Sequence, residues 1–386
     1  MASPVDTSVK FFRSTMPGAP SLTGAAGTLI SLLDACLVNG FGLQTATSVT
    51  VAGGIATAVF STNHAAAPGA VVLVAGATDT DLNGEGKVSA VATNSVSWPT
   101  TAADGTKVGT ITVKLASGGW NKPFTGTNLA AYKSASVQAN GHYLRVADTG
   151  TFEARVIGYE NMTAISTGTG PFPTSAQVSG GGYWGKTYDA GAVAVPWMLV
   201  TDGRMFYIFI CTYATVDAGV ANSQIYMFGD TDPRSSSGDP FSTILRCNTA
   251  TGQHNSLGGL YAVESGGTTT SYAPRASSGA GTSIAIYRHI VQRTGGPDQA
   301  PLPDPISGAV YLGRVYGEDT SSENTRYELP GLYGSLQTYA ERLFGRHQTT
   351  ADPATDTTYA VAMSTTGPNT GTILSPIFVD LSNSWR

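Results

Sequence analysis

The chain is poor in charged residues. Of its 386 residues only 12% are Asp, Glu, Lys or Arg, about half of the ~25% that is usual in soluble domains. The formal net charge is −5, which argues against the broad basic surface of a nucleic-acid-binding protein. We therefore expect no nucleic acid among its partners.

Cysteine and long apolar runs are scarce as well. The three cysteines, Cys36, Cys211 and Cys247, stand in apolar or strand-like surroundings without a CxxC pair, so we expect buried thiols and no disulfide scaffold. The longest apolar run, Met205–Cys211, is far shorter than the ~20 residues of a membrane helix. Met1–Phe12 lacks the basic-then-apolar pattern of a secretory signal. The sequence predicts a soluble protein without membrane insertion.

The residues that are abundant favour β-structure. The chain has 47 glycines, 20 prolines, and 17 tyrosines against 13 phenylalanines. Glycine and proline supply turns, and tyrosine is favoured in strands. A chain of this length has room for two or three domains. We predict a mainly β protein with many turns and an uncharged, polar surface.

One segment, Thr23–Gly42, has the spacing of an amphipathic helix. Its apolar residues recur at every third or fourth position, which places Leu29 and Leu33 on the same face. Thr23 is the expected N-cap and Gly40 the expected stop. Because short strands follow the helix, we expect its apolar face to pack against chain that comes after residue 115.

Residues 46–115 differ in sequence pattern from the chain on either side. Short apolar segments alternate with turn residues, a pattern typical of an Ig-like sandwich. We predict an inserted Ig-like β-sandwich at 46–115. Residues 1–45 and 116–386 then form one β-rich larger domain that carries the N-terminal helix. The strands expected in the sandwich are Ser48–Ala52, Ile55–Phe60, Ala70–Ala75, Lys87–Ala92, Ser95–Trp98 and Gly109–Lys114.

The clearest hairpin of the larger domain spans Trp197–Cys211. Its arms flank Thr201–Arg204, where an Asp-Gly pair favours a type I′ turn. Because both arms are almost entirely apolar, we expect the hairpin at the centre of a sheet, covered on both faces. Tyr143–Val146 and Phe152–Ile157 form a second expected hairpin. Further strands are expected at Ile225–Gly229, Ser283–His289, Ala309–Tyr316, Leu329–Leu332, Tyr359–Met363 and Ile377–Leu381, and loops at Asp230–Pro240 and Gly266–Gly281. Gly295–Pro305 is rich in proline and is expected to be extended.

The segment Gly180–Thr187 (GGGYWGKT) has the spacing of a phosphate-binding loop. In such a loop, backbone N–H groups surround a phosphate and a helix begins at the lysine. Here Gly191 and Pro196 follow, so no long helix can begin, and Tyr183 and Trp184 would crowd the phosphate. We predict a glycine-rich loop between strands that binds no nucleotide, and keep a nucleotide site as the alternative.

The segment Asp79–Glu85 (DTDLNGE) resembles the first half of an EF-hand calcium loop. The ligand positions and the glycine of that half are present, but Ala90 stands where the bidentate glutamate belongs. A hairpin turn at Asn83–Gly84 is favoured. Calcium binding near Asp79 and Asp81 stays the alternative.

The other polar residues show no catalytic spacing. No histidine has an HxH or HExxH partner, and no serine lies in a GxSxG elbow. An acidic stretch near the C-terminus is favoured as a solvated loop over a pair of glycosidase carboxylates. We therefore predict no catalytic, cofactor-binding or metal-binding residues, and no enzyme. The residues considered are His64, His142, His254, His289 and His347, and Glu318, Asp319, Glu323 and Glu328.

A set of segments spread over nearly the whole chain resembles one family. The segments are Met16–Pro20 (MPGAP), Leu29–Gly42 (LISLLDACLVNGFG), Leu82–Gly84 (LNG), Trp120–Lys133 (WNKPFTGTNLAAYK), Tyr143–Thr163 (YLRVADTGTFEARVIGYENMT), GPFPT, SGGGYWGK, LVTDGRMFYIFI, Leu329–Gln337 (LPGLYGSLQ) and FVDLSNSWR. Together they resemble an uncharacterised family of tailed-bacteriophage virion proteins, encoded among tail or baseplate genes.

This resemblance implies a structural component of the virion tail or baseplate, assembled in the host cytoplasm. Its partners would be other virion proteins and copies of itself, with three or six copies natural by tail symmetry. Two alternatives stay open: a host-surface adhesin of the tail tip that binds glycan, and a head decoration protein. For adhesion, the inserted sandwich is the expected part. Composition does not separate these roles, because Tyr with uncharged polar neighbours suits protein interfaces and sugar sites alike.

Overall fold

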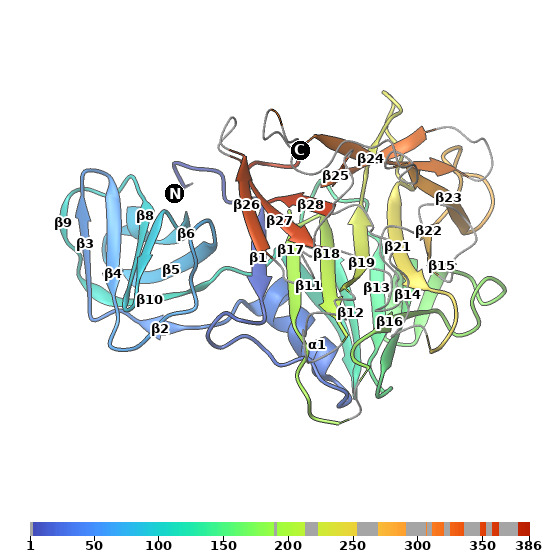
Figure 1. Ribbon diagram of the computed structural model, residues 1–386, viewed down its shortest axis with the longest axis horizontal. Coiled ribbons are helices and arrows are strands. Elements are labelled where there is room, and N and C mark those ends of the chain that lie inside the picture. Colours follow the sequence, from blue (N-terminus) through green and yellow to red (C-terminus); the bar gives the residue numbers. More distant parts are fainter. Residues whose placement is uncertain are drawn as a thin grey trace.

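The computed structural model describes residues 3–188, 191–212, 223–252, 269–290, 306, 311–319, 325–335, 348–352, 357–362 and 377–386. The protein is mainly β with one helix near the N-terminus, which confirms the predicted fold class (Figure 1). The strands form three sheets, of nineteen, five and four strands. Among the described residues, no helix has the length and apolar character required to span a bilayer.

The two smaller sheets are built from residues 44–115, which we call the module; it lies at the left of Figure 1. One sheet has the order β2-β10-β5-β6 and the other the order β7-β8-β4-β3-β9. The strands are β2 (Gln44–Thr45), β3 (Ser48–Ala52), β4 (Ile55–Val59), β5 (Val71–Ala77), β6 (Gly84–Lys87), β7 (Ala90–Ala92), β8 (Ser95–Pro99), β9 (Gly105–Thr106) and β10 (Gly109–Leu115), and the 3-10 helix η2 (Thr80–Leu82) follows β5.

The two sheets of the module pack face to face. Trp98 of β8 is buried against Gly86 of β6 in the opposite sheet, where a side-chain carbon on Gly86 would come within 2.4 Å of the indole. The prediction of one strand at Lys87–Ala92 is wrong: β6 ends at Lys87, and β7 begins in the other sheet. Val88 between them is buried, because the chain passes through the core from one sheet to the other. Whether 46–115 folds alone stays a prediction.

The helix begins later than predicted. Its α-helical part α1 (Thr28–Leu33) continues into a π-helix, η1 (Asp34–Asn39), which ends at Gly40 with φ of 69°, as expected of a glycine stop. Thr23 is not the N-cap, which is Gly27; the Thr23 hydroxyl accepts a hydrogen bond from the Ala25 N–H instead. The first helical N–H groups are bound by a carboxylate distant in sequence, described below.

All other strands belong to the nineteen-stranded sheet. Its strands are β1 (Lys10–Arg13), β11 (Trp120–Gly126), β12 (Leu129–Ser134), β13 (Tyr143–Ala147), β14 (Glu153–Ala164), β15 (Thr167–Phe172), β16 (Gly182–Gly185), β17 (Trp197–Thr201), β18 (Met205–Cys211), β19 (Ser223–Asp230), β20 (Asp232–Pro233), β21 (Thr243–Asn248), β22 (Thr269–Ala273), β23 (Ile284–Ile290), β24 (Leu312–Asp319), β25 (Thr325–Ser335), β26 (Gln348–Asp352), β27 (Thr357–Ala362) and β28 (Ile377–Asp380).

Both predicted loops in this part of the chain contain strands. The segment Asp230–Pro240 includes β20, which pairs with β25. The segment Gly266–Gly281 includes β22, which pairs with β21 and β23. Strand pairing satisfies backbone groups that these polar sequences would otherwise leave to water. The predicted extended segment, Gly295–Pro305, lies outside the described residues.

The hairpin of β17 and β18 is central and fully buried, as predicted. β1 pairs with one arm and β19 with the other. The predicted type I′ turn is wrong, because it requires positive φ at both central residues. Gly203 has φ of 84°, but among the described residues only Asn128 is a non-glycine with positive φ. The Asp202 carboxylate closes the turn by accepting hydrogen bonds from the N–H groups of Arg204 and Met205.

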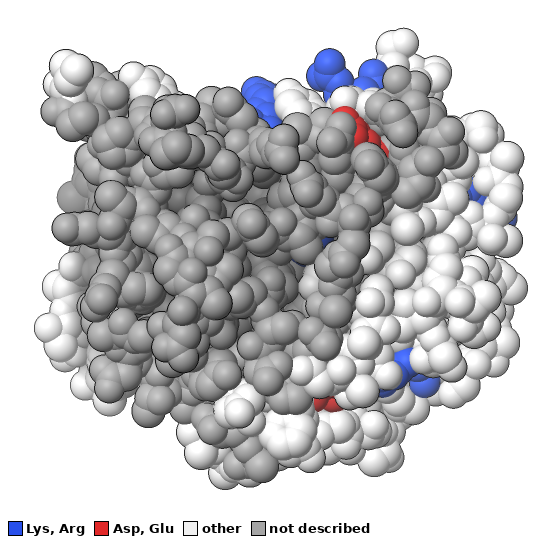
Figure 2. Space-filling model, turned by 45° about the vertical axis from the view of Figure 1, so that its right-hand side comes forward, with Lys and Arg blue, Asp and Glu red and all other residues white. Residues whose placement is uncertain are grey.

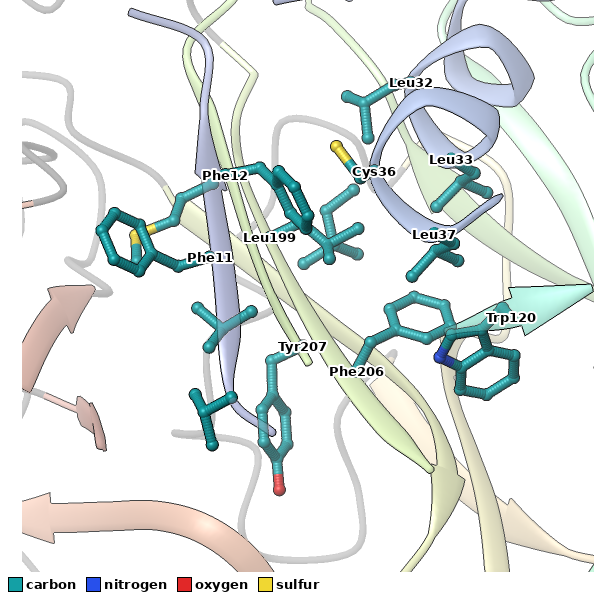
Figure 3. Packing of buried hydrophobic residues seen from close by; sticks show 14 of the residues in the cluster. Phe11, Phe12, Leu32, Leu33, Cys36, Leu37, Trp120, Leu199, Phe206 and Tyr207 are labelled. Carbon is teal, nitrogen blue, oxygen red and sulfur yellow. The ribbon is translucent and has the colours of Figure 1, made fainter. Parts of the chain in front are cut away.

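The helix packs on this hairpin and on β11 (Figure 3). Leu33 and Leu37 are fully buried, and the Trp120 ring meets Phe206 edge to face at 5.3 Å. Trp120 follows the module in sequence, so the expectation that the helix packs against chain after residue 115 is confirmed. On the other side of the core, Phe12 of β1 lies 5.8 Å from Phe41, ring centre to ring centre.

The module contacts the large sheet at several points. Lys10 of β1 pairs with Glu85 of β6 at 3.1 Å. Lys87 donates a hydrogen bond of 2.6 Å to the Ser382 carbonyl near the end of the chain. Phe11 packs beside Gly69. Apolar and polar contacts therefore hold the module against the rest of the protein.

The buried helix face generates a test of stability. The change Leu33→Ala removes a fully buried side chain, and we expect it to lower the free energy of unfolding by about 2–5 kcal/mol. Denaturant unfolding followed by circular dichroism measures this loss. The matched control is Ser31→Ala on the exposed face of the same helix, with an expected change within about 0.5 kcal/mol. Equal losses in the two variants would show that this face carries no core.

Candidate functional site

The lysine of the phosphate-loop match is buried and paired within the protein. The side chains of Lys186 and Asp148 are both 0% exposed, and Nζ lies 2.6 Å from Oδ1. The ammonium also donates to the Ala25 carbonyl at 3.0 Å.

The predicted glycine-rich loop is wrong for Gly182–Gly185, which is strand β16 and pairs with β14 and β21. No helix follows it in residues 186–188 or 191–212, so the geometry differs from that of a phosphate-binding loop. The absence of nucleotide binding stays a prediction.

The same aspartate binds the start of the helix. Oδ2 of Asp148 accepts hydrogen bonds from the N–H groups of Leu29, at 2.8 Å, and Ile30, at 3.4 Å. A carboxylate is favoured there because the first helical N–H groups have no partner inside the helix. Asp148 and Lys186 thus join the helix to β13 and β16, and their role is structural.

The calcium-like segment is also tied to the protein. Asp79 forms an ion pair of 2.6 Å with Lys107 and accepts a hydrogen bond from the Asp81 N–H. The hydrogen bond from Lys107 is the main reason why the pKa of Asp79 lies below its ordinary value. The predicted two-residue turn at Asn83–Gly84 is wrong: η2 intervenes, and the Asn83 side chain bonds both backbone groups of Ala77.

Among the described residues, no other candidate from the sequence forms a recognisable site. Nowhere in the described part of the chain do three or more His, Cys, Asp or Glu gather as a metal ion requires. All three cysteines are free thiols and buried, as predicted. A hollow lined by Asp81, Glu85 and Trp98, among others, encloses space of about the size of a single water molecule.

The predicted solvated acidic loop is wrong for the residues that are described. Glu318 lies in β24 and is buried. Glu328 lies in β25 and pairs with Arg314 at 2.7 Å. The two strands are neighbours, so the sequence places these acids in sheet structure. The side chain of Asp319 and all of Glu323 lie outside the described residues, as do His254 and His347 and the side chain of His289.

One histidine belongs to a buried polar network. His142 Nδ1 lies 2.7 Å from the Thr243 hydroxyl, which donates to Asp230 at 2.7 Å. Because that hydroxyl gives its proton to the carboxylate, it accepts the Nδ1–H of the imidazole. Burial lowers the pKa of His142 from its ordinary value. The network joins the segment just before β13 to the end of β19 and the start of β21.

A set of half-buried donors and rings gathers elsewhere, on the outer side of β11–β14 and β16. Their inner neighbours Leu144, Val146 and Val156 are buried, so alternate residues of the same strands point outward. Pairing places Arg145 beside Ile157, and Arg155 beside Tyr183. We call this set the aromatic-cationic face; it consists of Phe124, Lys133, Tyr143, Arg145, Arg155, Ile157, Tyr159 and Tyr183, all half-buried. One carboxylate, Glu153, lies on the same side of β14, two residues before Arg155, and accepts a hydrogen bond from the Thr251 hydroxyl at 2.9 Å.

Contacts within the protein fix these side chains. The Arg155 guanidinium stacks 3.8 Å from the centre of the Tyr183 ring, and Lys133 lies 4.8 Å from the centre of Tyr143. Arg145 donates to the Ile165 carbonyl at 2.8 Å. Sequence reasoning missed this face, although the alternation in Tyr143–Ala147 (YLRVA) carries its signal.

Comparison of the chain with models of known protein families and with curated proteins finds no match.

The buried ion pair generates a second prediction. The change Lys186→Met leaves the Asp148 carboxylate buried without its cation, and we expect a loss of about 3–5 kcal/mol in the free energy of unfolding. The double change Lys186→Met with Asp148→Asn should lose less, because the amide oxygen still accepts from Leu29 while no charge stays unpaired. Denaturant unfolding of both variants measures the difference. A loss in the double variant that equals or exceeds the loss in Lys186→Met would contradict the pairing.

The buried imidazole generates a third prediction. A lowered folded-state pKa means that the unfolded chain binds the proton first as the pH falls. The contribution of His142 is thus fully present above pH ~6.5, the ordinary histidine value, and is lost progressively below it. Urea unfolding between pH 7 and pH 5 should show a steeper loss for the natural chain than for His142→Gln. Parallel curves would contradict the burial of a neutral imidazole.

Proposed function

We propose that the protein is a non-enzymatic structural component of a tailed-bacteriophage particle, in the tail or baseplate. The observation that carries this proposal is that the residues with catalytic or ligand-binding patterns are bonded to the protein itself. Lys186 forms an ion pair with Asp148, and Lys107 forms one with Asp79. The segment SGGGYWGK, one of those that resemble phage virion proteins, contains this lysine. Its role in the fold supports a structural interpretation of the whole set.

The surface supports assembly through polar, uncharged contacts. Figure 2 shows one face on which blue and red side chains are few among the described residues. With 12% charged residues in the chain, hydrogen-bonded interfaces rich in Tyr and Gly are favoured over ion-pair networks. The proposed partners are copies of the same chain, in threes or sixes, and other virion proteins. Assembly would take place in the host cytoplasm.

Host-surface attachment is the second candidate, and the aromatic-cationic face favours it. The sequence favours the module as the adhesive part, but the aromatic residues of the module argue otherwise. Phe60 and Trp98 are its only Phe, Tyr or Trp, and they are 4% and 2% exposed. A sugar has no exposed ring to stack on there. If the protein attaches to a host surface, the large sheet is the better candidate.

The proposed function is tested by removing the gene for this chain from a phage that encodes it. We expect particles without tails, or with defective baseplates, by electron microscopy, and restoration when the gene is supplied from a plasmid. Complete tails with fragile heads would replace this proposal with head decoration. Complete, stable particles that fail to adsorb would replace it with host attachment alone.

A further inference from the structure

Three cations of the aromatic-cationic face have no carboxylate partner. Lys133, Arg145 and Arg155 form no ion pair in the described part of the chain, whereas Lys10, Lys107 and Lys122, for example, each do. Their contacts are to backbone carbonyls and rings: Arg145 to Ile165, Arg155 to Ser179, Gly180 and Gly181, and Lys133 to Tyr143. In a chain with a net charge of −5, unpaired cations gathered on one face indicate an anionic partner.

The strand register arranges the three cations along a diagonal. Tyr132 lies beside Leu144, so Lys133 is next to Tyr143, two residues before Arg145. Arg155 lies beside Ala147, two residues after Arg145. One cation therefore comes from each of β12, β13 and β14, and diagonal neighbours of this kind are about 7–8 Å apart. Such a line of charges fits an extended ligand that carries its acidic groups at intervals.

Aromatic rings lie along the same line. Tyr143 and Tyr159 are directly paired, and Phe124 lies 6.1 Å from Tyr143. The Tyr159 ring packs on Gly168, where a side-chain carbon would come within 2.5 Å of it; the missing side chain lets the ring lie against the backbone. Half-buried rings held in this way offer flat apolar surfaces beside hydroxyl groups.

The chemistry of this face suits a sugar chain better than a protein or a nucleic acid. The large hydrophobic side chains that are exposed in the described residues, such as Leu43, Val108 and Val137, lie outside it, so its apolar surface is limited to half-buried rings and Ile157 and is smaller than the centre of a stable protein interface. Three cations are also few for a nucleic acid, which carries a phosphate at every nucleotide. A sugar ring can stack its C–H groups on tyrosine while its hydroxyl and carboxylate oxygens accept from Arg and Lys.

We propose that the aromatic-cationic face binds an acidic, carboxylate-bearing polysaccharide. Lys133, Arg145 and Arg155 hold its carboxylates, and Tyr143 and Tyr159 stack against its sugar rings. This inference goes beyond the structural role in the particle and does not depend on it, because the isolated chain is sufficient to test it.

The test measures binding of the full chain to polygalacturonate by isothermal titration calorimetry at low salt. We expect saturable binding that weakens as salt is added, and no binding to neutral dextran.

The double change Lys133→Gln with Arg145→Gln should raise Kd about tenfold or more, equivalent to about 1.4 kcal/mol. The matched control, Lys107→Gln with Lys114→Gln in the module, removes the same charge and should stay within about twofold. Tyr143→Ala should also weaken binding about tenfold, with every charge in place.

Three results would overturn the proposal: no binding of polygalacturonate at low salt, equal weakening by the control pair, or equally tight binding of poly-glutamate or single-stranded oligothymidylate. The last two would show a general response to charge. If the double change lowers the melting temperature, the single change Lys133→Gln decides the question, because the lysine donates no hydrogen bond within the described protein. It should raise Kd about threefold or more without changing the melting temperature; an unchanged Kd overturns the proposal.

Discussion

The carboxylate of Asp148 is the point on which the arrangement of the larger part of the protein depends. One oxygen pairs with Lys186 and the other with the first N–H groups of the helix. The backbone of Asp148 adds two further bonds, to the Asn128 carbonyl and from the Gly27 N–H. With both side chains at 0% exposure, removal of any partner leaves a charge or a polar group in a low-dielectric interior, at a cost of several kcal/mol. Three distant segments must therefore come together in a single arrangement.

Polar bonds extend from this point along the helix. The Tyr132 hydroxyl contacts the Ile30 carbonyl and donates to Asp34 at 2.9 Å. Burial, followed by the charge of Asp34, raises the pKa of Tyr132 well above its ordinary value, so the hydroxyl keeps its proton and serves as a donor. Asp34 also pairs with Lys122 of β11 at 2.6 Å. The helix is thus bound at its start and in its middle by polar groups of the sheet, and its apolar face packs between them.

The structural features that the sequence predicted correctly are those determined by local pattern. The β17–β18 hairpin, the pairing of β13 with β14 and the glycine stop at Gly40 depend on residues close to one another in the chain. The start of the helix was missed because its cap, Asp148, lies 119 residues away from Leu29. Lys186 could not be assigned to an ion pair for the same reason. Glu318 was expected in solvent because charge is usually exposed, and only the pairing of β24 with β25 shows its burial. The alternation of residues in β13 indicates which of its side chains lie on the outer face. The grouping of Lys133, Arg145 and Arg155 on that face becomes visible only when the register of β12, β13 and β14 is known.

The position of the module in the sequence has a consequence for the order of folding. The helix leaves the ribosome about 160 residues before the β17–β18 hairpin on which its apolar face packs, which at about 5–20 residues per second is roughly 8–32 s. The module is made during that interval from contacts closer in sequence than those of the helix, and such contacts form early. Pairing of Gln44 with Val113 brings its two ends together. A folded module would therefore shorten the loop that must close before Asp148 reaches the helix.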